Sequence, residues 1–195
     1  MRVFVAVEID PKLFPVFERA SEALRATGVD AKWTIRSQWH VTLKFLGDVA
    51  DAQLPVVCDA VRRAASASFR GPLRLAGLGN FGGSSPRVLF ARVDDSSGAL
   101  IRAAANLERE LRPLGFPPEE RALQPHVTLG RVKSPRPAPA LLAAVKSTPA
   151  AGECEARELV LFSSELKPSG AEYTPALRAP LGATEVDDSR SGGRL

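Results

Sequence analysis

The tetrapeptide His-Val-Thr-Leu occupies residues 40–43 and recurs unchanged at residues 126–129. These two copies contain both histidines of the 195-residue chain. In a β-strand, successive side chains point to opposite faces of the sheet. Each copy therefore presents its histidine and threonine on one face and its valine and leucine on the other. Two such strands placed side by side predict a cleft that holds two imidazoles.

A purely structural interpretation of the repeat is also open. Valine, threonine and leucine are common in strands, so a shared string of four residues is not rare, and each histidine then serves only packing. A chain that has only two histidines and places both in the same string is harder to explain by chance. We therefore favour a functional pair.

The composition is that of a soluble globular protein, with 45% apolar and 25% charged residues. The length suits one domain, or two small lobes with a shared core. No apolar run of about 18 residues and no signal-peptide pattern occurs, so we expect no membrane span, no export and a cytoplasmic location. The formal charge of +4 and the pI of about 9.4 permit an anionic partner such as RNA without requiring one.

The two cysteines, Cys58 and Cys154, are isolated and lack the CxxC spacing. We expect them to be reduced packing residues rather than a disulfide. With two histidines and no cysteine cluster, the chain offers few ligands for zinc. The sequence therefore predicts no metal and no other cofactor.

Local patterns predict an alternation of strands and helices along the chain. Alternating or β-branched stretches predict strands at residues 2–8, 31–35, 40–46, 69–78, 87–93, 126–133, 156–165 and 172–179. Helical spacing of apolar residues predicts helices at residues 10–27, 51–67, 97–114 and 140–146, the third capped by Ser96 or Ser97. The glycine-rich residues 79–86 are either a hairpin connection or the rim of a cleft.

Helices interleaved with mostly antiparallel strands predict an α+β fold. Each half of the chain contains a helix, a His-Val-Thr-Leu strand, another helix and further strands. This indicates two pseudo-symmetric lobes, each with an antiparallel sheet and helices, and with the repeated strands lining the central cleft. We predict one bilobal domain over residues 1–182 and a disordered C-terminal tail over residues 183–195.

Two H-x-T-x motifs about 85 residues apart resemble the signature of the two-histidine (2H) phosphoesterases. Three stretches are similar to one group of that superfamily, the bacterial and archaeal RNA 2′,3′-cyclic phosphodiesterases, first named 2′-5′ RNA ligases. They are Arg-Val-Phe-Val-Ala-Val at 2–7, His-Val-Thr-Leu-Lys-Phe-Leu-Gly at 40–47 and His-Val-Thr-Leu-Gly-Arg at 126–131. The resemblance spans about residues 1–180, and a pair of motifs in this context is a specific signal.

The resemblance implies a bilobal α+β fold and metal-independent hydrolysis of an RNA 2′,3′-cyclic phosphate to a 2′-phosphate. It also implies reversible 2′-5′ RNA ligase activity, which several relatives have. By the family pattern His40 is the proton donor and His126 the proton acceptor. The two motifs are nearly equivalent, so the residues themselves leave this direction open.

The residue types suit such chemistry on their own. Opening a cyclic phosphodiester needs one group to deprotonate water and another to protonate the departing ribose oxygen. With an ordinary pKa of ~6.5, one imidazole can be neutral while the other is protonated near neutral pH, and each contributes about 10²–10⁴-fold. The hydroxyls of Thr42 and Thr128 can hydrogen-bond the nonbridging phosphate oxygens.

Charge on a pentacoordinate phosphorane favours a nearby cation, and two residues are candidates to bind the substrate in this way. Lys44 shares the face of His40 on ideal alternation, although a solvated strand lysine fits equally well. Arg131 falls on the face opposite His126 by strict alternation, unless a bulge near Gly130 turns it inward.

Several alternatives stay open. Trp39, Phe81 and Tyr173 are candidates to stack a base, with core packing as the other interpretation. The protein is an RNA 2′,3′-cyclic phosphodiesterase, a 2H phosphodiesterase for small cyclic nucleotides or 2′-5′ oligonucleotides, or a nucleotide- or RNA-binding module without turnover. A metal hydrolase fits poorly because ligands are scarce. We expect a monomer whose partner is RNA with a 2′,3′-cyclic phosphate end or a related nucleotide.

Overall fold

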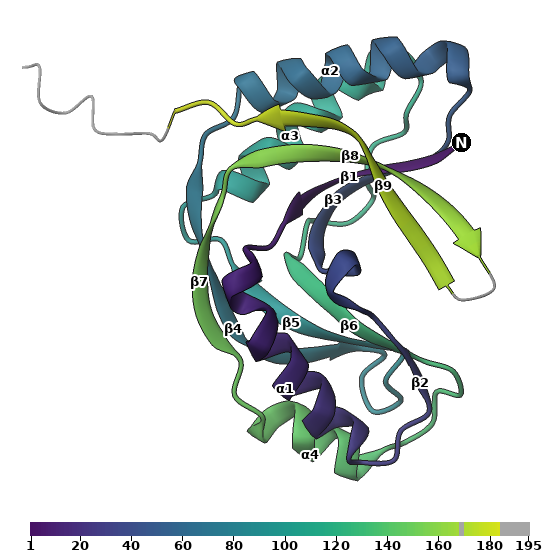
Figure 1. The fold of residues 1–195 in the computed structure, drawn as a ribbon, viewed down its shortest axis with the longest axis vertical. Coiled ribbons are helices and arrows are strands. Elements are labelled where there is room, and N and C mark those ends of the chain that lie inside the picture. The colour runs from purple at the N-terminus through teal and green to yellow at the C-terminus, as the bar shows by residue number, and fades with distance from the viewer. Residues whose placement is uncertain (168–169, 184–195) are drawn as a thin grey trace, which may run out of the picture.

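The computed structural model describes residues 1–167 and 170–183. Within them one curled antiparallel sheet runs through the molecule, with its strands in the order β7-β4-β5-β6-β3-β1-β8-β9 and with β2 paired to β6 (Figure 1). The strands are β1 (Arg2–Glu8), β2 (Ala31–Trp33), β3 (His40–Asp48), β4 (Gly71–Phe81), β5 (Val88–Asp94), β6 (His126–Val132), β7 (Ala151–Ala156), β8 (Glu158–Lys167) and β9 (Gly170–Pro180).

The α-helices pack in pairs on the two lobes (Figure 1). Helices α1 (Phe14–Arg25) and α4 (Pro139–Ser147) contact each other and the half of the sheet that contains β4 and β6. Helices α2 (Leu54–Ser66) and α3 (Ala99–Leu111) contact each other and the half that contains β3, β8 and β9. Short 3-10 turns lie at Pro11–Leu13, Arg36–Gln38, Asp51–Gln53 and Arg112–Leu114. The predicted α+β fold with two lobes is confirmed.

The two lobes meet where β3 and β6 lie side by side. These strands pair antiparallel through Val41 and Val127, the second residues of the two tetrapeptides. The strand order is symmetric about this pair, because four strands of the path lie on each side of the junction. A pseudo-twofold axis therefore passes between Val41 and Val127, as the repeated sequence predicts.

Strand β3 carries a one-residue bulge at the end of the first tetrapeptide. Its partner β1 aligns Ala6 with Thr42 but Val5 with Lys44, so Leu43 is the extra residue. Leu43 and Lys44 are consequently both buried, and Phe45 is 60% exposed. The predicted face of Lys44 was wrong, because the bulge reverses the alternation after Leu43 and places Phe45 on the open face instead.

Strand β6 carries the same bulge at the equivalent place. Its partner β5 aligns Phe90 with Thr128 but Leu89 with Gly130, so Leu129 is the extra residue. Leu129 and Gly130 are buried, and Arg131 is exposed on the face of His126 and Thr128. The bulge that turns Arg131 to this face is therefore present, at Leu129 and not at Gly130.

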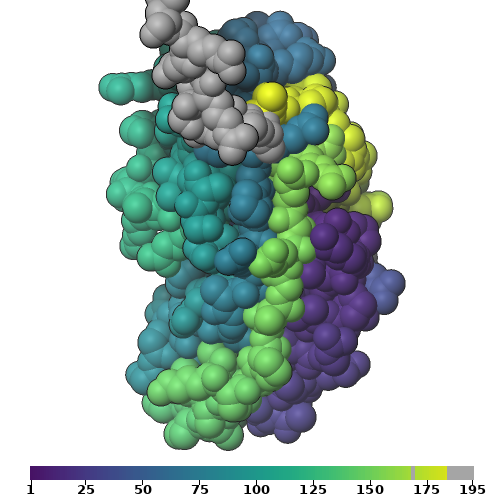
Figure 2. Space-filling model, turned by 90° about the vertical axis from the view of Figure 1, so that its left-hand side faces the viewer, coloured from purple at the N-terminus to yellow at the C-terminus, as the bar shows by residue number. Residues whose placement is uncertain are grey.

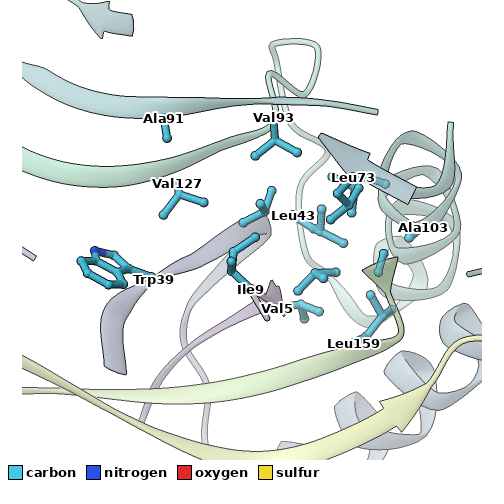
Figure 3. Close-up of a cluster of buried hydrophobic side chains, with 14 of the residues drawn as sticks. Val5, Ile9, Trp39, Leu43, Leu73, Ala91, Val93, Ala103, Val127 and Leu159 are labelled. Atoms are coloured by element: carbon cyan, nitrogen blue, oxygen red, sulfur yellow. The ribbon is translucent and has the colours of Figure 1, made fainter. Parts of the chain in front are cut away.

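The apolar side chains beneath the crossing form the core that both lobes share (Figure 3). Val41 and Val127 are 1% and 0% exposed and lie in this core with Trp39. Trp39 packs edge-on against Phe14 and Phe17, each at 5.2 Å between ring centroids. Burying side chains of this size stabilises the fold by about 1.5–3 kcal/mol each. Trp39 is thus a core residue, and the alternative that it stacks a base is wrong.

The helices begin and end close to the predicted positions for local reasons. Helix α1 buries Phe17, Ala20 and Leu24 at helical spacing and is followed by Gly28, whose φ of 75° suits glycine. The start of α3 differs from the prediction in its cap. The carboxylate of Asp95 accepts from the backbone N–H groups of Leu100 and Ile101 at 2.9 and 3.0 Å, as a capping side chain does.

Strand β7 was not predicted from the sequence. It pairs along β4 from Ala156 to Ala151 and follows α4 along the side of the molecule, where the green segment runs past the purple N-terminal part (Figure 2). Its apolar face consists only of Cys154 and Ala156, and alanine, glycine and glutamate have a low preference for strands. The predicted loop at residues 79–86 is shorter than expected, because β4 continues to Phe81.

The chain passes repeatedly between the lobes, for example from β1 to α1 and from β7 to β8 (Figure 1). The single domain expected over residues 1–182 stays a prediction. Of the expected disordered tail, residues 184–195 lie outside the described residues. None of the described helices is long and apolar enough to cross a membrane. Cys58 and Cys154 are both free thiols.

Candidate active site

Two histidines and two threonines from the repeated tetrapeptides lie together on the open face of the sheet. His40, Thr42, His126 and Thr128 are each partly exposed, whereas the residues between them are buried. Continuing the antiparallel register from Val41 and Val127 places each histidine opposite the threonine of the other strand. The floor of the cleft therefore offers an imidazole and a hydroxyl on either side of the pseudo-twofold axis.

Aromatic side chains surround His40. The ring centroids of Phe4, Tyr173 and Phe162 lie 5.0, 5.4 and 5.8 Å from that of the imidazole. Burial among them lowers the pKa of His40 to about 4, against the opposing effect of the Glu8 carboxylate, and the charge of nearby His126 lowers the pKa further. His40 is thus neutral in the free protein at neutral pH.

The Glu8 carboxylate is itself held by Arg178. Glu8 pairs with His40 across β1 and β3. Arg178 donates to the two Glu8 oxygens at 2.5 and 3.1 Å and also contacts Glu158. These interactions raise the pKa of Arg178. Because Arg178 neutralises part of the carboxylate charge, Glu8 only partly offsets the effect of burial on His40.

His126 has one ring nitrogen tied to the backbone. Its Nδ1 lies 2.8 Å from the carbonyl oxygen of Gln124, which can only accept a hydrogen bond. Nδ1 therefore carries the proton, and the Nε2 of the neutral ring is the unprotonated atom. Burial lowers the pKa of His126, the bond to Gln124 raises it, and the charge of Arg131 lowers it. Phe81 and Phe90 lie 5.1 and 5.0 Å from the ring.

Thr34 holds the bulge of β6 in place, although no motif in the sequence indicates this role. Its hydroxyl donates to the carbonyl oxygens of Thr128 and Leu129 at 2.8 and 3.0 Å. The indole N–H of Trp39 donates in turn to the Thr34 hydroxyl at 3.0 Å. Trp39 thus orients the Thr34 hydroxyl, and this hydroxyl holds the part of β6 that leads to Arg131.

Lys44 does not lie in the cleft, contrary to the expectation from strict alternation. Its side chain is 2% exposed, and its Nζ donates to Glu108 Oε1 at 2.7 Å and to the carbonyl oxygen of Pro117 at 2.8 Å. Glu108 Oε1 also accepts from the backbone N–H of Glu119 at 3.2 Å. Lys44 therefore anchors the segment between α3 and β6, and the prediction that it faces the phosphate was wrong.

One pocket opens beside each histidine. A pocket of about 680 Å³ opens beside Thr42 and His126. A second pocket of about 530 Å³ opens beside His40, and both charged residues such as Glu8 and Glu158 and aromatic residues such as Phe162 line it. Among the residues that the structure describes, no three His, Cys, Asp or Glu side chains gather as a metal site requires.

Of the three aromatic residues considered for base stacking, two lie at the cleft and one does not. Tyr173 packs edge-on against His40, and Phe81 packs edge-on against His126. Trp39 lies in the core, as described above. No signal in the sequence distinguishes Phe4, Phe90 and Phe162, which also pack on the histidines, from ordinary apolar strand residues.

Comparison with known proteins assigns the family. Residues 14–168 match the model described as the 2′-5′ RNA ligase superfamily, and the chain belongs to that superfamily. The chain is 37% identical over 153 residues to a protein of Aeropyrum pernix named RNA 2′,3′-cyclic phosphodiesterase, covering 77% of this chain and 84% of the relative. It is 31% identical over 178 residues to a protein of the same name from Archaeoglobus fulgidus, covering 89% and 96%.

A solved structure shows the same fold. The crystal structure of TT0787 of Thermus thermophilus superposes with a TM-score of 0.80 at 28% identity, covering 94% of this chain and 99% of that one. The family resemblance noted in the sequence is confirmed by these comparisons.

Proposed function

We propose that the protein is an RNA 2′,3′-cyclic phosphodiesterase that hydrolyses the cyclic phosphate at an RNA end to a 2′-phosphate. The twofold arrangement of the cleft floor is the observation that supports this most. A phosphate centred between His40 and His126 has an imidazole on either side and a threonine hydroxyl beside each. The relatives from Aeropyrum pernix and Archaeoglobus fulgidus carry the name of this activity.

His126 serves as the proton acceptor in this mechanism. Because the Gln124 carbonyl holds the hydrogen on Nδ1, the neutral ring offers its unprotonated Nε2 to the attacking water. As the water oxygen bonds to phosphorus, one water proton passes to Nε2. The resulting imidazolium keeps its hydrogen bond to Gln124, which stabilises the charged form.

His40 serves as the proton donor on the other side of the phosphorus. Its proton passes to the ribose 3′ oxygen as the bond between phosphorus and that oxygen breaks, which leaves a 2′-phosphate and a free 3′-hydroxyl. The pKa of His40 is about 4 in the free protein, so the bound phosphate anion must raise it before His40 can donate near neutral pH. This requirement makes the reaction depend on pH.

The threonines and Arg131 bind the phosphate in this proposal. Hydroxyls of Thr42 and Thr128 donate to the nonbridging oxygens, and Arg131 supplies positive charge from the same face. A ribose 5′-hydroxyl in place of the water makes a 2′-5′ linkage with the same proton transfers. Reversible ligation therefore needs no additional residue.

The test uses an oligonucleotide that ends in a 2′,3′-cyclic phosphate. We expect the purified protein to open it in the presence of EDTA and to leave a 2′-phosphate. His40→Ala and His126→Ala are each expected to lower kcat by about 10²–10⁴-fold, the range for a general acid or base. Thermal unfolding of both variants checks that the fold is intact. Full activity in either folded variant excludes the two-histidine mechanism.

A substrate panel separates the proposed function from the alternatives. Faster turnover of small cyclic nucleotides or 2′-5′ oligonucleotides assigns a different substrate to the same site. Binding without product identifies a binding module, and loss of activity in EDTA identifies a metal hydrolase. The expected monomer and cytoplasmic location are tested by light scattering and by cell fractionation.

A further inference from the structure

A carboxylate lies beside His40 on the neighbouring strand. Glu8 is directly opposite His40 in the antiparallel pairing of β1 with β3. Residues that are directly opposite each other in such a pair project from the same face of the sheet, with their Cβ atoms about 4.5–5.5 Å apart. Glu8 and His40 also line the same pocket. The carboxylate is therefore held on the open face, next to the imidazole.

The equivalent place beside His126 is occupied by a cation. Strand β5 is the outer neighbour of β6, as β1 is of β3. Arg92 on β5 lies opposite His126 in that pairing. A nearby carboxylate favours the protonated form of an imidazole, and a nearby guanidinium disfavours it. The near-symmetry of the two tetrapeptides is thus broken by opposite charges one strand away from each histidine.

Arg178 and Glu158 keep the Glu8 carboxylate in its place. Arg178 on β9 donates to the two Glu8 oxygens at 2.5 and 3.1 Å and also contacts Glu158 on β8. Two carboxylates that share one guanidinium leave one negative charge in excess beside His40. The interaction with Arg178 therefore orients Glu8 without cancelling the negative charge of the cluster.

The other charged and titratable groups around His40 do not replace Glu8. They come from β6, β8, β9 and the walls of the pocket, and they are His126, Glu158, Tyr173, Arg178, Asp10, Arg36, Glu155 and Arg157. Burial lowers the pKa of His40 most, the Glu8 carboxylate raises it, and the charge of His126 lowers it. Among the described residues, Glu8 is thus the group that opposes the effect of burial.

We propose that Glu8 is the positioning residue that makes His40 the proton donor of the pair. This inference rests on the proposed function, since it takes both imidazoles to serve the opening of the cyclic phosphate. The Glu8 carboxylate stabilises the imidazolium that forms when the phosphate anion binds, whereas Arg92 gives His126 no such support. Arg178 limits the effect, because it neutralises part of the carboxylate charge. Removing Arg178 therefore acts on His40 in the opposite direction from removing the charge of Glu8.

The experiment measures kcat against pH on an oligonucleotide that ends in a 2′,3′-cyclic phosphate. The high-pH limb of this profile reports loss of the proton from the donor in the complex. Glu8→Gln is expected to move this limb to lower pH by about one pH unit, so that kcat above the limb is about tenfold lower. Arg178→Gln is expected to move the limb to higher pH. Loss of packing alone does not produce shifts of opposite sign.

Two variants serve as controls. Glu8→Asp keeps the carboxylate and is expected to keep the limb close to its wild-type position. Glu153→Gln removes the same charge from β7 at the far edge of the sheet, where the side chain is 62% exposed and pairs with Arg74. Its profile is expected to match that of the wild type. Shifts of the same sign in Glu8→Gln and Arg178→Gln, or an unmoved limb in both, overturn the proposal.

A titration by proton NMR tests the role of Glu8 without turnover. The chain contains only two histidines, so both imidazoles are resolved, and His126→Gln identifies the signal of His40. In the free wild type we expect this signal to titrate with a pKa of about 4. The pKa of His40 is expected to be lower in Glu8→Gln and higher in Arg178→Gln. Unchanged titrations with full turnover overturn only the role of Glu8, whereas the expected titrations without any opening of the cyclic phosphate overturn the proposed function.

Discussion

His40 is the residue on which the proposed reaction places the strongest demand, because it must carry a proton where a charged ring is poorly solvated. Its neighbours Phe4 and Phe162 are 3% and 4% exposed, so little water reaches that side of the imidazole. In the proposed reaction, His40 therefore acquires this proton together with the substrate, and the phosphate anion is the group that raises its pKa.

The pH dependence of the reaction follows from the two imidazoles. Burial lowers the pKa of His40 to about 4 and also lowers the pKa of His126. In the free protein the two imidazoles therefore bind their first proton only below the ordinary pKa of histidine, about 6.5. We expect kcat/KM, which reports the free protein, to be maximal below about pH 6.5. We expect kcat, which reports the complex, to be maximal at higher pH. The measurement is a pH–rate profile for both constants.

The two pKa values from that profile belong to the pair and not to either ring, because the rings influence each other. His126→Gln and His40→Gln, assayed at residual activity, are each expected to remove one limb of the bell. A kcat/KM maximum above about pH 7, the same as that of kcat, contradicts the burial of His40 described here.

Burial of His40 also affects stability. The folded pKa is about 4 and the unfolded pKa about 6.5, so the unfolded chain binds more protons between these values. The free energy of unfolding therefore falls as the pH drops below about 6.5, and by pH 4 His40 accounts for about 3 kcal/mol of this loss. We expect His40→Gln to lose about 3 kcal/mol less than wild type between pH 7 and pH 4 in urea unfolding. Identical losses contradict this assignment.

At the scale of the elements, the sequence predicts most of the strands and helices but not the bulges. The four residues of each tetrapeptide follow the alternation, and their faces could be predicted from it. Lys44 and Phe45 could not be placed, because the extra residue at Leu43 is defined by the pairing of β3 with β1, which lies far away in the sequence. Arg131 depends in the same way on the pairing of β6 with β5.

The ion pair of Lys44 and Glu108 allows the buried position of Lys44 to be tested. Lys44→Met leaves the Glu108 carboxylate without its cation and is expected to lower the free energy of unfolding by about 3–5 kcal/mol. Lys44→Met with Glu108→Leu removes both charges and is expected to be more stable than the single variant. Chemical denaturation of the two single variants and the double variant measures the coupling.

The double variant also tests whether Lys44 contacts the substrate. A lysine that binds the reacting phosphate is expected to cost about 10²-fold or more in kcat when removed. Because Lys44 lies under the sheet, we expect the folded double variant to keep kcat within about tenfold of wild type. A loss of kcat of about 10²-fold or more with the fold intact indicates that Lys44 contacts the substrate.

Thr34 stabilises the bulge of β6 through its hydroxyl. Thr34→Val removes the hydroxyl that donates to Thr128 and accepts from Trp39, which leaves buried polar groups without partners. We expect the free energy of unfolding to fall by about 1–3 kcal/mol and kcat/KM to fall with it. Thr34→Ser keeps the hydroxyl and is the matched control, with both values close to wild type. Equal stability of Thr34→Val and wild type contradicts this role.

At the scale of the whole molecule, the lobes share one sheet and the chain crosses between them several times. Residues of the β1–α1 segment contribute to both lobes, so neither lobe has a separate stretch of chain. We therefore expect a single cooperative unfolding transition. Fluorescence of Trp33 and Trp39 reports β2 and the shared core, and circular dichroism reports all helices. Coincident denaturation curves are the expected result, and two separated transitions contradict it.

The pseudo-twofold axis between Val41 and Val127 has a consequence for regiochemistry. A cyclic phosphate has two ester bonds, one to the 2′ oxygen and one to the 3′ oxygen, which lie on either side of the phosphorus. A floor made of two nearly identical tetrapeptides presents almost the same groups to both oxygens. Under the proposed function, we therefore expect the bond that breaks to be selected by side chains that differ between the two ends, such as Phe45 and Arg131.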